Sequence, residues 1–151
     1  MIGIKNYTPQ VLLLSLTFFF VHDISTKAQQ QDENRSAPVR EIKSVDEFNR
    51  VLKDNRQPKV LKFFSPSCRH CIKVKRIVQD VAQQHPNVLF LEFSSNNARV
   101  NKLFDTYNVQ AYPTFVFIDA SGKTFTTHEG GYSHKELDDA IASLEKRAKK
   151  S

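Results

Sequence analysis

The feature that most constrains the fold of this 151-residue chain is a regular alternation of short apolar runs with helical stripes. Three runs are almost wholly apolar and end at turn residues: Val60–Phe64, Val88–Phe93 and Thr114–Ile118. Strands that are buried on both faces of a sheet have this composition. Between these runs, apolar residues recur at the spacing of an amphipathic helix. The alternation predicts an α/β domain with a central mixed β-sheet and helices on both faces.

The expected order is strand, helix, strand, helix, strand, helix, strand, strand, helix, beginning with a short strand at 39–43. Ser44–Glu47 and Ser133–Glu136 each carry a Ser followed three residues later by Glu. This is the spacing of a capping box, and it predicts the starts of two helices. The run at 114–118 and the segment 123–127 are joined tightly, so these two strands are expected to be antiparallel. Residues 39–148 have the size of one ordinary domain.

The residues before this domain have the layout of a secretory signal. In residues 1–28, Lys5 precedes the apolar run Val11–Val21, and Thr26-Lys27-Ala28 offers small residues to a signal peptidase. The run is shorter than the about 20 residues of a membrane helix, so we expect cleavage. An uncleaved anchor and an unrelated buried segment are the alternatives. Residues 29–38 are polar and without periodicity, which predicts a linker. We therefore expect an exported protein, either periplasmic or secreted.

The charge of the chain gives little indication of a partner. The net charge is +6, and only residues 146–150 are densely basic. Cations at the end of a helix are placed favourably against its dipole, so a solvated helix end is expected there rather than a nucleic-acid or membrane surface. The interleaved aromatic and basic residues of single-strand binders are missing from the sequence. We expect a monomer with no nucleic-acid partner, and membrane contact only through an uncleaved N-terminal segment.

The two cysteines lie between a predicted buried strand and a predicted helix. Cys68 is expected at the helix N-terminus, where free N–H groups and the helix dipole stabilise the reactive thiolate. Arg69 adds a cation, and His70 adds a second cation or a hydrogen bond, so both are expected to lower the pKa of Cys68. Cys71, one turn further along and more buried, should keep a higher pKa and act as the resolving thiol. A stabilised thiolate makes the disulfide a stronger oxidant, which favours oxidation or isomerisation of substrates over reduction.

Other interpretations of this pair remain open. A C-x-x-C pair can be half of a zinc site, which His85, His128 or His134 could complete, although four ligands are usual and a second cysteine pair is absent from the sequence. We expect no metal. The pair can also form a purely structural disulfide, although so short a loop removes little entropy. His70 can be an exposed polar residue without a role.

The segment Phe63–Cys71 resembles the active site of the thioredoxin superfamily, and its C-x-H-C form is similar to that of protein disulfide isomerases and bacterial disulfide oxidases. Val109–Phe115 resembles the cis-proline loop of the family, and Gly130-Gly131 is a weaker match. The resemblance covers about Val39 to Leu144. It implies a thioredoxin fold over 39–148 and a thiol-disulfide oxidoreductase that acts on protein substrates, exchanges electrons with a redox partner and needs no cofactor.

The resemblance also implies roles for particular residues. Cys68 and Cys71 would be catalytic. A cis bond between Tyr112 and Pro113 would place the Tyr112 backbone beside the disulfide, where it can pair with an extended substrate. An ordinary trans proline at the start of a strand is the alternative.

Two positions depart from the family pattern. The residue six before the first cysteine is usually a buried Asp or Glu, which helps to deprotonate the second cysteine, and here it is Lys62. The alternation along each strand places Lys62 and Glu92 in line with buried apolar residues, so we hypothesise that they pair beneath the active site. A Lys62 side chain that reaches the surface is the alternative. Ser67 stands where the family usually has Trp, which leaves a smaller and more polar surface near Cys68.

Two further functions compete with disulfide exchange. In the first, the scaffold is a binding module that presents its proline loop to a partner, and the cysteines are incidental. The presence of both cysteines argues against this interpretation. In the second, the protein carries copper or zinc.

Overall fold

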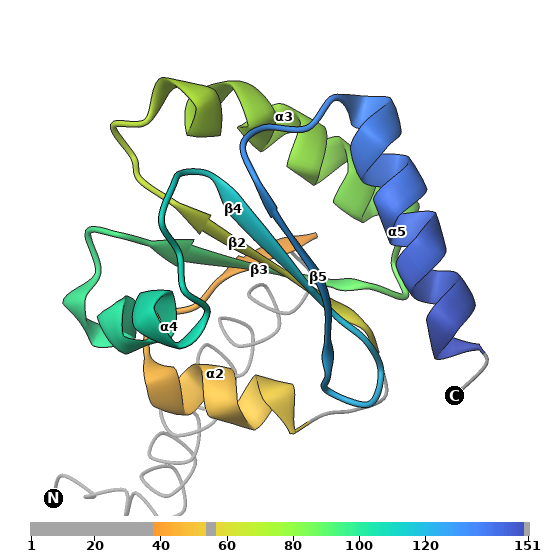
Figure 1. Cartoon of the computed structure of the whole chain (residues 1–151), viewed down its shortest axis with the longest axis horizontal. Coiled ribbons are helices and arrows are strands. Elements are labelled where there is room, and N and C mark those ends of the chain that lie inside the picture. Colours follow the sequence, from red (N-terminus) through yellow and green to blue (C-terminus); the bar gives the residue numbers. More distant parts are fainter. Residues whose placement is uncertain (1–37, 54–56, 150–151) are drawn as a thin grey trace, which may run out of the picture. The chain divides into compact units, whose positions relative to one another are not determined.

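The structure is a computed structural model that describes residues 38–53 and 57–149 (Figure 1). The predicted signal segment 1–28 lies outside the described residues, as does the predicted linker 29–38 except for Pro38. The elements follow the predicted order with one added 3₁₀ turn, η2: β1 (Val39–Glu41), α2 (Val45–Leu52), β2 (Lys59–Phe64), α3 (Arg69–Gln84), β3 (Leu89–Ser94), η2 (Ala98–Val100), α4 (Asn101–Thr106), β4 (Thr114–Ile118), β5 (Thr124–Glu129) and α5 (His134–Ala148).

The strands form one five-stranded mixed sheet in the order β1-β3-β2-β4-β5. β1 and β2 both pair with β3 in parallel, whereas β4 runs antiparallel to both β2 and β5. The β4–β5 hairpin turns at Gly122, whose φ of 83° is a left-handed conformation that glycine adopts without steric cost. The Asp119 carboxylate accepts hydrogen bonds from the backbone N–H groups of Ser121 and Lys123 and so closes this turn. The predicted mixed sheet and its antiparallel hairpin are confirmed.

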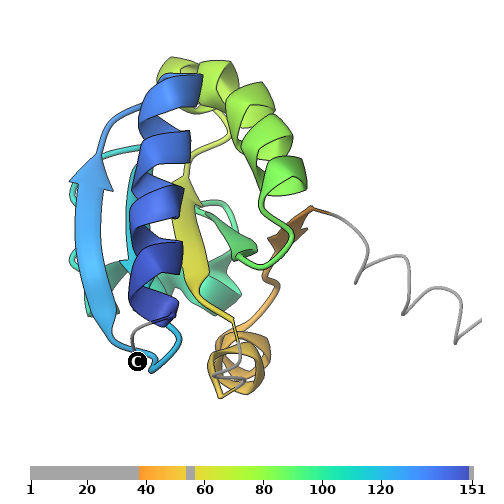
Figure 2. The same ribbon diagram turned by 90° about the vertical axis from the view of Figure 1, so that its right-hand side faces the viewer.

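Helices cover both faces of this sheet, with α3 and α5 on one face and α2 and α4 on the other (Figures 1 and 2). Successive side chains of a strand point to opposite faces. In β2, Val60 accordingly packs with the core under α3 and α5. Its neighbours Leu61 and Phe63 pack with the core under α2 and α4. The apolar runs in the sequence are therefore strands that are buried on both sides.

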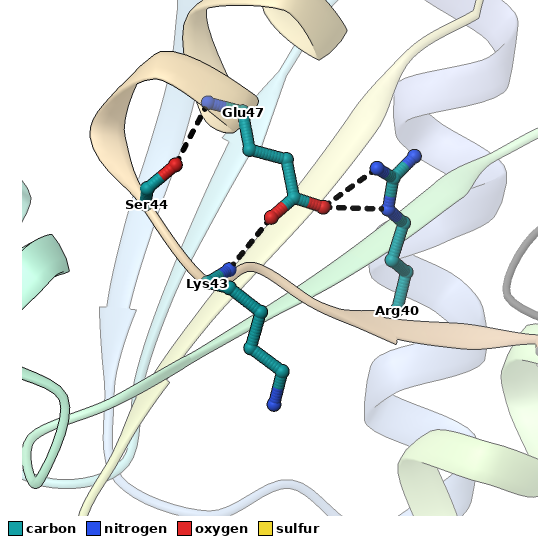
Figure 3. Close-up of polar contacts among 4 residues, drawn as sticks. All are labelled: Arg40, Lys43, Ser44 and Glu47. Carbon is teal, nitrogen blue, oxygen red and sulfur yellow. Dashed lines mark hydrogen bonds and ion pairs between the residues drawn. The ribbon is translucent and has the colours of Figure 1, made fainter.

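The two expected capping boxes have different outcomes. At α5, the Ser133 hydroxyl accepts from the Glu136 N–H and the Glu136 carboxylate accepts from the Ser133 N–H, so the box is complete. At α2, Ser44 accepts from the Glu47 N–H, but the Glu47 carboxylate turns away (Figure 3).

At the start of α2, one oxygen of the Glu47 carboxylate accepts from both Nε and Nη2 of Arg40, at 3.1 and 2.6 Å. The other oxygen accepts from the Lys43 N–H at 2.8 Å. Charge-assisted hydrogen bonds are roughly twice as strong as neutral ones, so the guanidinium draws the carboxylate away from the N-cap. The expectation of a reciprocal box at Ser44 was therefore wrong in its second half.

The topology brings two distant segments to the same edge of the sheet. β2 and β4 are neighbours, so the end of β2 that leads into α3 lies beside the start of β4 and the Pro113 loop. The Gly130 N–H donates to the Pro113 carbonyl at 2.8 Å, which ties this loop to the end of β5. Within the part of the chain that the structure describes, no helix is long and apolar enough to cross a membrane.

Candidate active site

Cys68 is the N-cap residue of α3. Its backbone is extended, with φ −77° and ψ 116°, and its sulfur accepts a hydrogen bond from the Cys71 N–H at 3.2 Å. The Ile72 N–H donates to the Cys68 carbonyl at 3.1 Å and continues the first turn. Ser, Thr, Asp and Asn usually provide this cap through an oxygen. Here the sulfur of a free thiol takes that place at the positive end of the helix.

This position lowers the pKa of the Cys68 thiol. Partial burial acts in the opposite direction, but it is outweighed by hydrogen bonds from the Cys71 thiol and from the backbone N–H groups of Cys71 and His70, with a smaller contribution from the Lys62 charge. Each of these groups stabilises the anion more than the neutral thiol. The sequence predicted a thiolate stabilised by the helix N-terminus, and the geometry shows which N–H groups are involved.

The second cysteine, Cys71, lies in surroundings that disfavour its thiolate. Cys71 is buried, with 3% of its surface exposed. Burial, together with the hydrogen bond to Cys68, raises the pKa of the Cys71 thiol to about 11, although the Ser65 backbone and the Lys62 charge oppose this rise. The pair is therefore asymmetric in the expected sense, with an accessible sulfur that ionises readily and a covered one that resists ionisation.

This asymmetry predicts a single alkylation step, at a pH below the ordinary cysteine pKa. The rate of iodoacetamide alkylation of reduced protein should reach half its maximum at a pH below the ordinary cysteine pKa, because the anion is the reactive form. The rate should fall as the pH drops through the lowered pKa of Cys68, while Cys71, with a pKa of about 11, contributes little. Mass spectrometry of the labelled peptide identifies the sulfur. Labelling of Cys71 first would contradict the assignment.

The hypothesised ion pair beneath the cysteines is present. Lys62 and Glu92 face each other across the parallel β2–β3 pair, and Lys62 Nζ lies 2.6 Å from Glu92 Oε1. The exposed side-chain fractions are 3% for Lys62 and 16% for Glu92, so the alternative of a surface lysine is wrong. The lysine also lies 5.2 Å from the centre of the Phe64 ring. The position that is usually acidic in the family thus holds a cation here, and the carboxylate that pairs with it is Glu92 on the adjacent strand β3.

A cavity of about 270 Å³ connects this pair to the resolving thiol. Lys62, Glu92 and Cys71 all line it, and Phe64, Pro66 and Ile72 form much of its apolar wall. This volume is sufficient for several water molecules. The Lys62 charge lowers the pKa of both thiols from this position.

The proline loop lies against the exposed sulfur. The Tyr112–Pro113 peptide bond is cis, and the Cys68 thiol donates to the Tyr112 carbonyl at 3.5 Å. The Tyr112 ring packs edge-on against Phe104, with 6.0 Å between the ring centres, and remains 40% exposed. The expected cis bond and the expected neighbourhood of Tyr112 and Cys68 are therefore present. Phe104 of α4 thus supports Tyr112, a role that the amphipathic pattern of the sequence did not indicate.

Arg69 and His70 lie at the start of α3 with exposed side chains. Neither side chain makes a hydrogen bond or an ion pair within residues 38–53 and 57–149. His70 acts on Cys68 through its backbone N–H. The expected tuning by the two side chains stays a prediction. Over the same ranges, no group of three or more His, Cys, Asp or Glu side chains is placed to hold a metal ion.

Solved structures with a similar fold include a thioredoxin from Trypanosoma brucei brucei and a thioredoxin from Nicotiana alata. The first has a TM-score of 0.63 at 21% identity and covers 72% of this chain and 91% of its own. The second has a TM-score of 0.64 at 18% identity and covers 72% of this chain and 93% of its own. This likeness shows the thioredoxin fold.

Similar sequences carry the name protein disulfide-isomerase. The protein from Datisca glomerata is 28% identical over 130 residues, which is 83% of this chain and 24% of that protein. The protein from Triticum aestivum is 27% identical over 115 residues, which is 76% of this chain and 22% of that protein. The chain thus spans about a quarter of the length of these relatives. The model of the thioredoxin family matches residues 39–143, and the chain therefore belongs to the thioredoxin family.

Proposed function

We propose that this protein is a thiol-disulfide oxidoreductase that exchanges disulfides with protein substrates through Cys68 and Cys71. The observation that carries the proposal is the environment of the Cys68 sulfur. It is partly exposed, it caps α3, its pKa is lowered, and it lies 3.5 Å from the backbone carbonyl of Tyr112. The relatives named protein disulfide-isomerase support the same assignment.

In the reducing direction, the Cys68 thiolate attacks one sulfur of a substrate disulfide. A mixed disulfide forms, and the other substrate sulfur leaves as a thiolate. Cys71 then loses its proton and attacks the Cys68 sulfur, which releases the second substrate thiolate and leaves the Cys68–Cys71 disulfide. Two electrons pass from the protein to the substrate. Tyr112 and Pro113 orient the substrate beside the sulfur, because the backbone of the loop can pair with an extended chain.

The same steps in reverse oxidise a substrate dithiol. We place this protein on the oxidase or isomerase side, because groups that stabilise the Cys68 thiolate favour the reduced protein and make its disulfide a stronger oxidant. No cofactor beyond the dithiol takes part in this scheme. A redox partner must restore the starting state after each cycle.

The deciding experiment combines an activity assay with a reduction potential. Reduction of insulin, or oxidative refolding of a reduced protein, tests whether disulfides are exchanged at all. A chain that does neither would be the binding module or the metal carrier, which metal analysis of the purified protein tells apart. Equilibration of the Cys68–Cys71 couple with glutathione then gives the direction. A potential of about −120 to −180 mV supports an oxidase or isomerase, whereas one of about −270 mV indicates a reductase.

Export is a further part of this proposal. It rests on the layout of residues 1–28, and an oxidising compartment suits a redox-active cysteine pair. N-terminal sequencing of the protein from its natural compartment tests it, because cleavage after Ala28 leaves a chain that begins at Gln29. An intact Met1 would contradict cleavage.

A further inference from the structure

The exposed face of α3 carries a row of cations that begins next to the reactive sulfur. Arg69, Lys73 and Arg76 are spaced at i, i+4 and i+7, which places them on one side of the helix, and all three are exposed. We call these three residues the basic stripe. Within the described part of the chain, Arg69 and Lys73 form no ion pair, and Arg76 approaches only Asp80, at 3.9 Å.

The basic stripe is unfavourable for the helix that carries it. Cations in the first turns of a helix oppose its dipole, and like charges four residues apart repel. The first turn of α3 contains no acidic residue. By contrast, α2 begins with Asp46 and Glu47, and α5 has Glu136 in its first turn. The packing and capping of α3 therefore do not require these cations, and an anionic partner would offset their repulsion.

The surroundings of the sulfur show where such a partner would lie. The large apolar side chains that are exposed in the described residues are Ile72, at 63%, and Tyr112, at 40%. Both residues are close to Cys68 along the backbone, since Ile72 lies one turn further along α3 and the Tyr112 carbonyl accepts from the Cys68 thiol. A chain segment that crosses Cys68 thus meets apolar contacts near the sulfur and cations along α3.

We propose that the basic stripe selects protein substrates whose reactive cysteines lie in acidic segments. Asp and Glu side chains of the substrate pair with Lys73 and Arg76 while its sulfur meets Cys68. This inference rests on the proposed function and names its class of substrate. Charge complementarity of this kind acts mainly on the association rate and weakens as salt is added.

The test uses three disulfide peptides that are identical except for flanking acidic, neutral or basic residues. The measured quantity is the rate constant of reduction by the fully reduced protein, divided by the rate constant for the neutral peptide. At low ionic strength the acidic peptide should react about tenfold faster than the neutral one, and the basic peptide more slowly. Near 1 M salt, where charges are screened beyond about 3 Å, the three rates should converge to within about twofold.

The double substitution Lys73→Glu and Arg76→Glu should abolish or reverse this preference. The ratio to the neutral peptide removes any change in the reactivity of Cys68 itself. Lys123→Glu with Lys146→Glu makes the same change in net charge, in the β4–β5 turn and near the end of α5, and should keep the preference. Circular dichroism should show both variants folded, since all four side chains are exposed and the Arg76–Asp80 contact at 3.9 Å is a weak surface ion pair.

Each outcome is decisive. Equal rates for the acidic and basic peptides would overturn the inference but leave the proposed function intact. An equal loss of preference in both double variants would assign it to the overall charge and also overturn the role of the basic stripe. A wild-type protein that reduces none of the peptides, and forms no mixed disulfide with them, would remove the proposed function and this inference with it.

Discussion

Replacing Cys68 by Ser should abolish disulfide exchange and leave the fold intact. A hydroxyl cannot form the mixed disulfide, so the rate of insulin reduction should fall on the order of a thousandfold or more, to the uncatalysed background. Ser is a preferred N-cap residue, and its oxygen can accept the Cys71 N–H bond that the sulfur accepts now. The thermal midpoint should therefore change little. Loss of activity together with loss of folding would leave no support for a chemical role.

The matched substitution Cys71→Ser should stop the reaction one step later. Cys68 still attacks the substrate, but no second thiol is present to release it, so a mixed disulfide through Cys68 should accumulate. Non-reducing electrophoresis and mass spectrometry of the trapped species measure this directly. A complex trapped by Cys68→Ser and not by Cys71→Ser would reverse the two roles.

The sequence was most informative where the periodicity of its apolar residues was enough to determine the structure. The two-residue period of the strands, together with the order of elements, was enough to place Lys62 and Glu92 on one face of adjacent strands, and their Nζ–Oε1 contact of 2.6 Å follows from that register. The cysteine spacing likewise placed one sulfur at the N-cap and the other a turn deeper. These features depend on backbone geometry, which the pattern of apolar residues determines.

Features that depend on competition between side chains were not predictable. The Ser44–Glu47 spacing predicted a reciprocal capping box. Instead, Arg40, seven residues before Glu47, forms an ion pair with the Glu47 carboxylate. For His70 the structure shows a contribution to Cys68 from the backbone N–H, and the expected contribution of its ring stays a prediction. The basic stripe was not identified from the sequence, because its three residues are not consecutive along the chain and only the helix brings them into a row.

Removing the Lys62 charge should produce the largest loss of stability among the proposed substitutions. In Lys62→Leu, the Glu92 carboxylate keeps its mostly buried position, with 16% of its side chain exposed, and loses its cation. Breaking a buried ion pair from one side typically costs 3–5 kcal/mol. We expect about 3 kcal/mol here because Glu92 retains some solvent. Urea unfolding at pH 7 measures the change, and a loss below about 1 kcal/mol would show that the pair behaves as a surface ion pair.

The double variant Lys62→Leu with Glu92→Leu separates the structural role of the pair from its effect on the cysteines. Replacing both charges by apolar residues is often neutral for stability, so most of the lost free energy of unfolding should return. The reactivity of the thiols should not return. The Lys62 charge lowers the pKa of both sulfurs, so without it the Cys68 thiolate forms at higher pH and the alkylation profile shifts upward.

The disulfide should then be a weaker oxidant in both the single and the double variant, because the reduced form has lost part of its stabilisation. Recovery of stability without recovery of the pH profile would show that the buried lysine, six residues before Cys68, tunes the redox pair directly. If the double variant regained the original profile, Lys62 would act only by holding the fold around Cys68, and the charge beneath the cysteines would have no part in their chemistry.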